Sequence, residues 1–70
     1  MARIAKVIEI IGSSESSWQD AADSALQEAK KTVSHISGIE VGEMTADVQD
    51  GRVTAYHTVI KVAFAVERAE

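Results

Sequence analysis

The clearest pattern in the sequence is a strict alternation from Val53 to Val66, VTAYHTVIKVAFAV. One face of this segment carries mostly β-branched and aromatic side chains, namely Thr54, Tyr56, Thr58, Ile60, Val62, Phe64 and Val66. A period of two with these residue types predicts a β-strand rather than a helix. At about 3.3 Å per residue the strand would span roughly 46 Å, whereas a compact domain of this length has a radius of gyration of about 11 Å. We therefore expect the strand either to bend sharply or to place its far end against another subunit.

The opposite face of the same segment is less aromatic. It carries His57 together with Val53, Ala55, Val59, Lys61, Ala63 and Ala65. A single helix can cover only one face of a sheet, so the apolar residues of this second face would stay exposed. Exposed apolar surface of this kind usually marks a contact with another molecule. This face is a second, independent reason to expect subunit contacts.

A shorter alternating segment, IAKVIEII from Ile4 to Ile11, predicts a first strand. Gly12 and the serines that follow it are expected to end this strand. The serines fit a turn and the start of a helix. They lack the glycine pattern and the lysine of a phosphate-binding P-loop.

After the serines, apolar residues recur at steps of three and four, which predicts one long amphipathic helix. Its apolar stripe comprises Trp18, Ala22, Ala25, Ala29, Val33 and Ile36. Ser16 and Gln19 have the spacing of a capping box, and Gly38 stands where a helix C-terminal glycine is expected. Acidic residues lie early and Lys30 and Lys31 late, the order that the helix dipole favours.

The segment IEVGEMTADV, from Ile39 to Val48, predicts a second strand. Gly42 in its interior indicates a bulge or a close backbone approach. The dipeptide Asp50–Gly51 is favoured in tight hairpin turns, so the second and third strands should pair antiparallel. The expected fold class is α+β with the order β-α-β-β, a single domain over residues 1–70.

Three carboxylates lie along the second strand. Under strict alternation Glu43 and Asp47 share one face, and Glu40 lies on the other. Calcium requires several converging oxygen ligands, and no EF-hand spacing is present. A solvated strand edge is the expectation, although symmetry could bring carboxylates from several subunits together.

Composition narrows the function classes. Among 70 residues there are no cysteines, so disulfides and a Cys/His zinc cage are excluded. Such a small chain without a disulfide or structural metal commonly gains stability by oligomerising. The net charge is −4 with no basic cluster beyond Lys30–Lys31, which argues against a nucleic-acid partner. The N-terminal apolar run is too short for a signal peptide or a membrane span, so we expect a cytoplasmic protein without a membrane partner.

No recognisable motif places an acid–base pair beside the serines, so we expect a protein that is not an enzyme. His35 falls in the predicted last helical turn, where it would cap carbonyl groups or remain solvated. For His57 three interpretations remain open: a partly exposed or interface histidine, a ligand contact, or a general base. Tyr56 and Trp18 are expected to pack against the core rather than to stack on a ligand.

The order and spacing of several short motifs make the chain resemble the dodecin family. These motifs are KVIEIIGSS, ES, W and DA near the start, TV at the expected helix end, IEV, DG and the closing KVAF. The resemblance covers nearly the whole chain without a visible gap. It implies a three-stranded antiparallel sheet partly wrapped around one helix, with twelve copies forming a hollow shell.

The resemblance also implies a function and a set of site residues. Characterised dodecins bind flavins at subunit interfaces and are regarded as storage or buffering proteins. Their stacking tryptophan corresponds here to Gly38, their flavin-binding glutamine to His57, and a basic residue for the flavin phosphate to Thr45. The expectation is a non-enzymatic dodecamer that binds riboflavin or FMN with weakened affinity. The alternative is a dodecin-like shell that holds another small ligand or a metal ion such as calcium, or that is purely structural.

Overall fold

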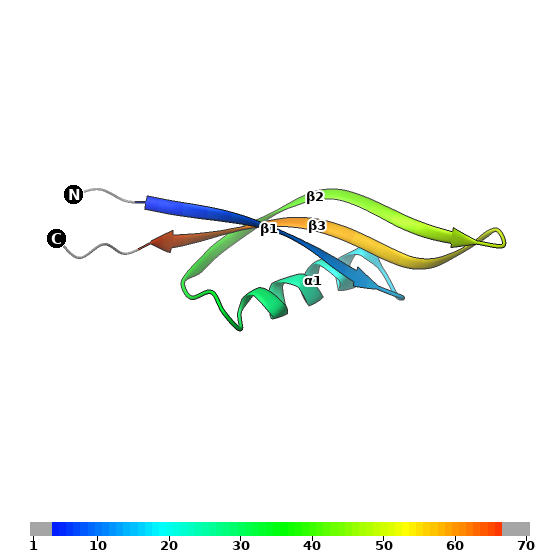
Figure 1. The fold of residues 1–70 in the computed structure, drawn as a ribbon, viewed down its shortest axis with the longest axis horizontal. Helices are drawn as coiled ribbons and strands as arrows, with labels where there is room; N and C mark the ends of the chain where they lie inside the picture. The colour runs from blue at the N-terminus through cyan, green and yellow to red at the C-terminus, as the bar shows by residue number, and fades with distance from the viewer. Residues whose placement is uncertain (1–3, 67–70) are drawn as a thin grey trace.

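A computed structural model describes residues 4–66, in which one helix packs on an antiparallel three-stranded sheet (Figure 1). The elements follow the predicted order: β1 (Ile4–Ser14), α1 (Trp18–Ala29), β2 (Ile36–Gln49) and β3 (Arg52–Val66). The strands lie in the order β1-β3-β2, so β3 pairs with both of the others. The predicted α+β fold class is confirmed.

The alternation of β3 determines which side of the sheet the helix covers. Thr58, Ile60 and Val62 of β3 are buried beneath α1, on the face that the sequence pattern identified as the more aromatic one. The helix contributes Ala21, Ala25 and Ala29, which are also buried. Because alanine side chains are small, the helix backbone can lie close to the strands.

The closest approach between α1 and the sheet is at Gly12. This residue does not end β1, as the sequence had suggested; it pairs with Thr58 inside the strand and is buried. A Cβ atom at this position would collide with the backbone carbonyl oxygen of Ala21 and would lie 3.0 Å from the Cβ of Ala25. Gly12 is therefore required by helix–sheet contact rather than by a turn, which is one of the uses of glycine within strands.

The helix begins one residue later than the capping-box spacing indicated. Ser17 is the N-cap, and its Oγ accepts a hydrogen bond from the backbone N–H of Asp20 at 3.0 Å. Ser16 instead donates its own backbone N–H to Ser14 Oγ at 2.9 Å. The predicted pairing of Ser16 with Gln19 was wrong, because Ser16 belongs to the turn that leaves β1.

We expect Ser17→Ala to lower the free energy of unfolding by about 1 kcal/mol, because the amide of Asp20 loses its capping oxygen. Ser16→Ala is the matched control and should change stability by less than about 0.5 kcal/mol. Urea unfolding at one fixed protein concentration compares the two. Equal losses in both variants would contradict the assignment of the cap.

The helix also ends earlier than predicted. It stops at Ala29, and its C-cap is Lys30, so neither lysine of the pair Lys30–Lys31 lies in its last turn. His35 is outside the helix at φ 61°, a left-handed conformation. The role of Gly38 as a helix C-terminal glycine was wrong, because Gly38 lies within β2. β2 starts at Ile36 because its pairing with Phe64 of β3 outweighs the helical periodicity.

β2 is irregular, and this changes which of its side chains share a face. The predicted irregularity at Gly42 is confirmed by a register shift between Val41 and Met44. Glu40 pairs with Lys61, and Asp47 pairs with Ala55. Because directly paired residues share a sheet face, Glu40 and Asp47 lie on the same side. The expectation from strict alternation was wrong, since a bulge inserts an extra residue and reverses the parity beyond it.

The hairpin between β2 and β3 is tight and projects away from the helix. Asp50 and Gly51 have φ values of 53° and 74°, the left-handed conformations of a type I′ turn, as the sequence predicted. The chain measures 58 × 19 × 12 Å, with a radius of gyration of 14.9 Å. Figure 1 shows the hairpin tip extending beyond both β1 and α1. The long strand β3 thus does not fold back onto its own protomer.

Two apolar surfaces remain exposed in the single chain. Because α1 packs on β1 and β3, the helix-side face of β2 is left uncovered. It lines a groove of about 720 Å³ that includes Trp18, Leu26, Ile39, Val41, Met44 and Thr58. The second surface is the sheet face away from α1, where Val7 and Ile11 are more than half exposed. Within residues 4–66, no helix has the length and apolar character to cross a membrane.

Candidate ligand-binding site

The sheet face away from α1, here called the open face, carries most of the polar residues singled out in the sequence. Its members are Ala55, His57, Val59, Lys61, Ala63 and Ala65 of β3, together with their register partners Ala5, Val7, Glu9, Ile11, Ser13, Gly38, Glu40, Thr45 and Asp47. His57 is central in this face, paired with Ser13 on β1 and with Thr45 on β2. Two of the three predicted site residues, His57 and Thr45, are therefore direct neighbours.

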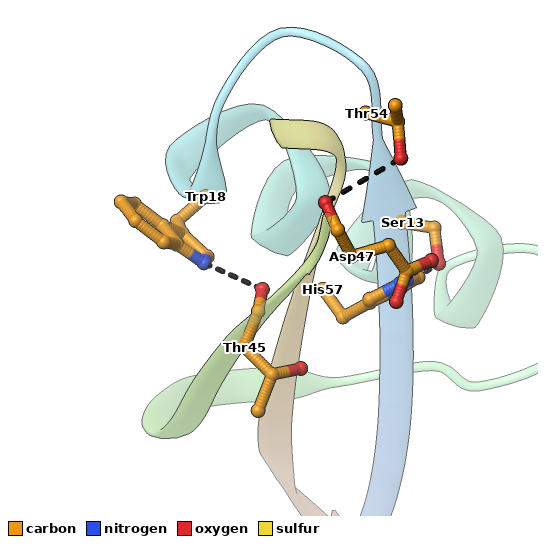
Figure 2. Close-up of polar contacts among 6 residues, drawn as sticks. All are labelled: Ser13, Trp18, Thr45, Asp47, Thr54 and His57. Atoms are coloured by element: carbon orange, nitrogen blue, oxygen red, sulfur yellow. Dashed lines mark hydrogen bonds and ion pairs between the residues drawn. The ribbon is translucent and has the colours of Figure 1, made fainter. Parts of the chain in front are cut away.

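His57 forms a continuous hydrogen-bonded chain across all three strands. Its Nδ1 lies 2.8 Å from Ser13 Oγ, and its Nε2 lies 3.0 Å from Asp47 Oδ2 (Figure 2). No motif in the sequence indicated this contact between a serine, a histidine and an aspartate. It arises because β1 continues to Ser14 and because the bulge near Gly42 places Asp47 on the open face.

This chain of three residues resembles the order hydroxyl, imidazole and carboxylate of serine hydrolases, but its geometry differs. The serine contacts Nδ1 and the aspartate contacts Nε2, whereas in those enzymes the serine contacts Nε2. Helix N-termini are one source of the backbone donors that stabilise an oxyanion. Here the N-terminus of α1 is on the covered face and Ser13 is on the open face. The contacts of this histidine thus differ from those of a serine hydrolase.

Trp18 and Thr54 fix the backbone of β2 around Asp47. The indole Nε1 of Trp18 donates to the Thr45 carbonyl oxygen at 2.8 Å (Figure 2). Thr54 Oγ1 donates to the Asp47 carbonyl oxygen at 3.4 Å. Trp18 also packs edge-on against Tyr56, with ring centroids 4.8 Å apart. Trp18 thus packs against Tyr56, but it is itself 40% exposed and is not part of the buried core.

Gly38 lies in a separate hollow of about 490 Å³, lined by Val7, Gly38, Ile39, Glu40, Lys61 and Ala63. Its register partner Ala63 is six residues from His57 along β3, a separation of about 20 Å. The structure therefore does not bring Gly38 and His57 together within one chain. A Cβ atom at Gly38 would meet no heavy atom within 4 Å, so the hollow has room for a larger side chain.

A row of charged residues crosses the open face, and two of them, Glu40 and Lys61, also line this hollow. Lys61 of β3 pairs with Glu9 on β1 and with Glu40 on β2. Within residues 4–66, no group of three or more His, Cys, Asp or Glu side chains is placed to hold a metal ion. A cation bound by carboxylates of these residues would need ligands from more than one protomer.

Comparison with known proteins decides the family. The family model for dodecin matches residues 4–67. The chain belongs to the dodecin family. It is 33% identical over 67 residues to a dodecin from Thermus thermophilus, covering 96% of this chain and 97% of the relative. It is 35% identical over 65 residues to a calcium dodecin from Mycobacterium tuberculosis, covering 93% and 92% of the two chains.

Solved dodecin structures have the same fold. A substituted variant of the Thermus thermophilus dodecin superimposes with a TM-score of 0.90 at 32% identity, over 97% of this chain and 100% of that one. The Mycobacterium tuberculosis calcium dodecin, described as having a novel calcium-binding site, gives 0.79 at 34% identity over 96% of each chain. The resemblance found in the sequence is thus confirmed at the level of the family and its fold.

Proposed function

We propose that this member of the dodecin family is not an enzyme but binds a small ligand. It is a single-domain protein of the cytoplasm, and twelve copies assemble into a homo-oligomeric shell. The ligand is a flavin, riboflavin or FMN, held with weakened affinity. Neither nucleic acid nor a membrane is a partner. The observation that carries this proposal is the match to dodecin over residues 4–67, together with an open face that has both a hollow around Gly38 and a polar cluster around His57.

The exposed apolar surfaces support the assembly. Val48 and Val53, near the hairpin tip, are 62% and 49% exposed, and the groove beside α1 is lined largely by apolar residues. Exposed apolar surfaces of this kind are usually buried against a partner. We expect light scattering to give a mass of about 90 kDa, twelve times the chain mass of 7.5 kDa. A particle with the mass of a monomer or dimer would overturn the shell.

Weak flavin binding follows from the residues at the proposed flavin positions. Gly38 has no ring to stack on the flavin, and His57 replaces a glutamine. Losing about 3 kcal/mol of contacts weakens binding by about two orders of magnitude. We expect riboflavin and FMN fluorescence to be quenched only at protein concentrations of tens of micromolar or more. Unchanged fluorescence at the highest soluble protein concentration would remove the flavin from the proposal.

Calcium is the second candidate, because a relative of 35% identity is a calcium dodecin. Glu9, Glu40 and Asp47 supply carboxylates on the open face, and copies related by symmetry would supply the further oxygen ligands that calcium requires. If calcium is the ligand, millimolar Ca²⁺ will raise the unfolding temperature relative to EDTA, and Mg²⁺ will not reproduce the rise. An unfolding temperature that does not change with Ca²⁺ would exclude calcium as the ligand.

A further inference from the structure

Both ring nitrogens of His57 are already engaged within the chain. Nδ1 is 2.8 Å from Ser13 Oγ, and Nε2 is 3.0 Å from Asp47 Oδ2. The side chain of His57 is only 27% exposed, whereas that of Asp47 is 62% exposed. A ligand on the open face would therefore meet Ser13 and Asp47 before it could reach a free nitrogen of His57.

The partners of His57 fix the direction of each hydrogen bond. A carboxylate can only accept hydrogen bonds, and a neutral imidazole carries one N–H. The contact with Asp47 therefore requires the hydrogen on Nε2, which leaves Nδ1 as an acceptor. Ser13 must then donate its hydroxyl hydrogen to Nδ1, and its remaining lone pairs point away from His57.

The atoms that Ser13 and Asp47 leave for a ligand are all acceptors while His57 is neutral. Ser13 Oγ has used its hydrogen on His57, and Asp47 Oδ2 accepts from His57. Within residues 4–66, Asp47 Oδ1 has no hydrogen-bonding partner. The carbonyl oxygens of Thr45 and of Asp47 itself are held by Trp18 and Thr54 (Figure 2), so this exposed carboxylate is also positioned.

We propose that Ser13 and Asp47, oriented by His57, form a hydrogen-bond acceptor site on the open face that selects ligands presenting an N–H or O–H donor. His57 is then a positioning residue rather than a ligand contact. For a flavin the donor is the imide N–H of the ring. The choice of a flavin as the ligand rests on the proposed function. The acceptor site itself does not.

The first test needs no ligand. In a His35→Asn background, where Asn tolerates the left-handed backbone, only His57 contributes histidine ring signals. Carbon-13 and nitrogen-15 NMR at pH 8 should show the Nε2–H tautomer almost alone, and Asp47→Ala should shift the ratio toward that of a free imidazole, in which Nε2–H is only the major form. A dominant Nδ1–H tautomer, or an even mixture in the parent, would overturn the proposal.

The second test uses lumiflavin and its N3-methyl derivative, which lacks the imide N–H. At pH 8 methylation should weaken binding about tenfold, the value of one good hydrogen bond. The discrimination should disappear in Ser13→Ala combined with Asp47→Ala, and it should persist in the control Ser16→Ala. Equal affinities for both compounds at pH 8 would refute the acceptor site. If neither compound binds, the flavin proposal fails. The NMR measurement of the His57 tautomer then tests the acceptor site by itself.

Discussion

Gly12→Ala is expected to destabilise the protein by about 3 kcal/mol, at the upper end of the usual cost of overpacking a core. The added methyl group would collide with the Ala21 carbonyl oxygen, which belongs to the helix backbone and has no rotamer with which to move away. Relief requires α1 to shift from β1, and this would loosen the buried contacts of Ala25 and Ala29. Urea unfolding at a fixed protein concentration measures the effect.

Gly38→Ala is the control for this experiment. Gly38 also lies in a strand, but an added Cβ at this position meets no heavy atom within 4 Å. Its φ is not among the positive values, so alanine fits without backbone strain, and a small gain of stability is expected from the less flexible unfolded chain. A loss of stability in Gly38→Ala comparable with that in Gly12→Ala would show that helix contact is not the cause. If Gly12→Ala does not fold, the soluble yield of the control separates the two positions.

Gly38→Trp combined with His57→Gln is expected to increase flavin affinity by about two orders of magnitude. The hollow around Gly38 has room for a ring. An aromatic pair contributes about 0.5–1.5 kcal/mol beyond the area it buries, and the buried area adds to this. Together with the amide contact of glutamine, about 3 kcal/mol corresponds to the expected change in dissociation constant. Fluorescence titration with riboflavin measures it.

Gly38→Leu combined with His57→Gln is the matched control. Leucine fills the same hollow with apolar volume but offers no flat ring for stacking. Its affinity should rise much less than that of the tryptophan variant. Equal gains in both variants would mean that simple burial, and not ring stacking, determines affinity at this position. No gain in either would mean that flavin binds elsewhere or not at all.

Prediction from the sequence was most accurate where a local pattern and a tertiary contact indicate the same buried face. The alternation of β3 identified the buried face of Thr58, Ile60 and Val62, because that face is determined by parity alone. Prediction failed for Ile36, which fits the helical stripe but pairs with Phe64. A local periodicity contains no information about a partner strand 28 residues away, so the helix was extended too far.

The polar cluster was missed for a related reason. His57 was singled out from the sequence, but Ser13 was assigned to a turn and Asp47 was left without a contact. Both belong to the site because of the register of their strands with β3. The signal for Asp47 was present in Gly42, since a bulge at that glycine reverses the parity of every later residue in the strand. Applying the bulge to the pattern would have placed Asp47 on the face of His57.

The central position of β3 leaves β1 and β2 as the two edges of the sheet. A regular edge strand exposes backbone donors and acceptors on which another chain can extend the sheet. β2 is a poor template for such growth, because its register shifts at Ile36/Gly38, Val41/Met44 and Asp47/Val48 interrupt any continuous ladder. The same irregularities that bring Asp47 to His57 thus oppose open-ended polymerisation. Contact through the exposed apolar faces is therefore favoured over extension of the sheet at β2.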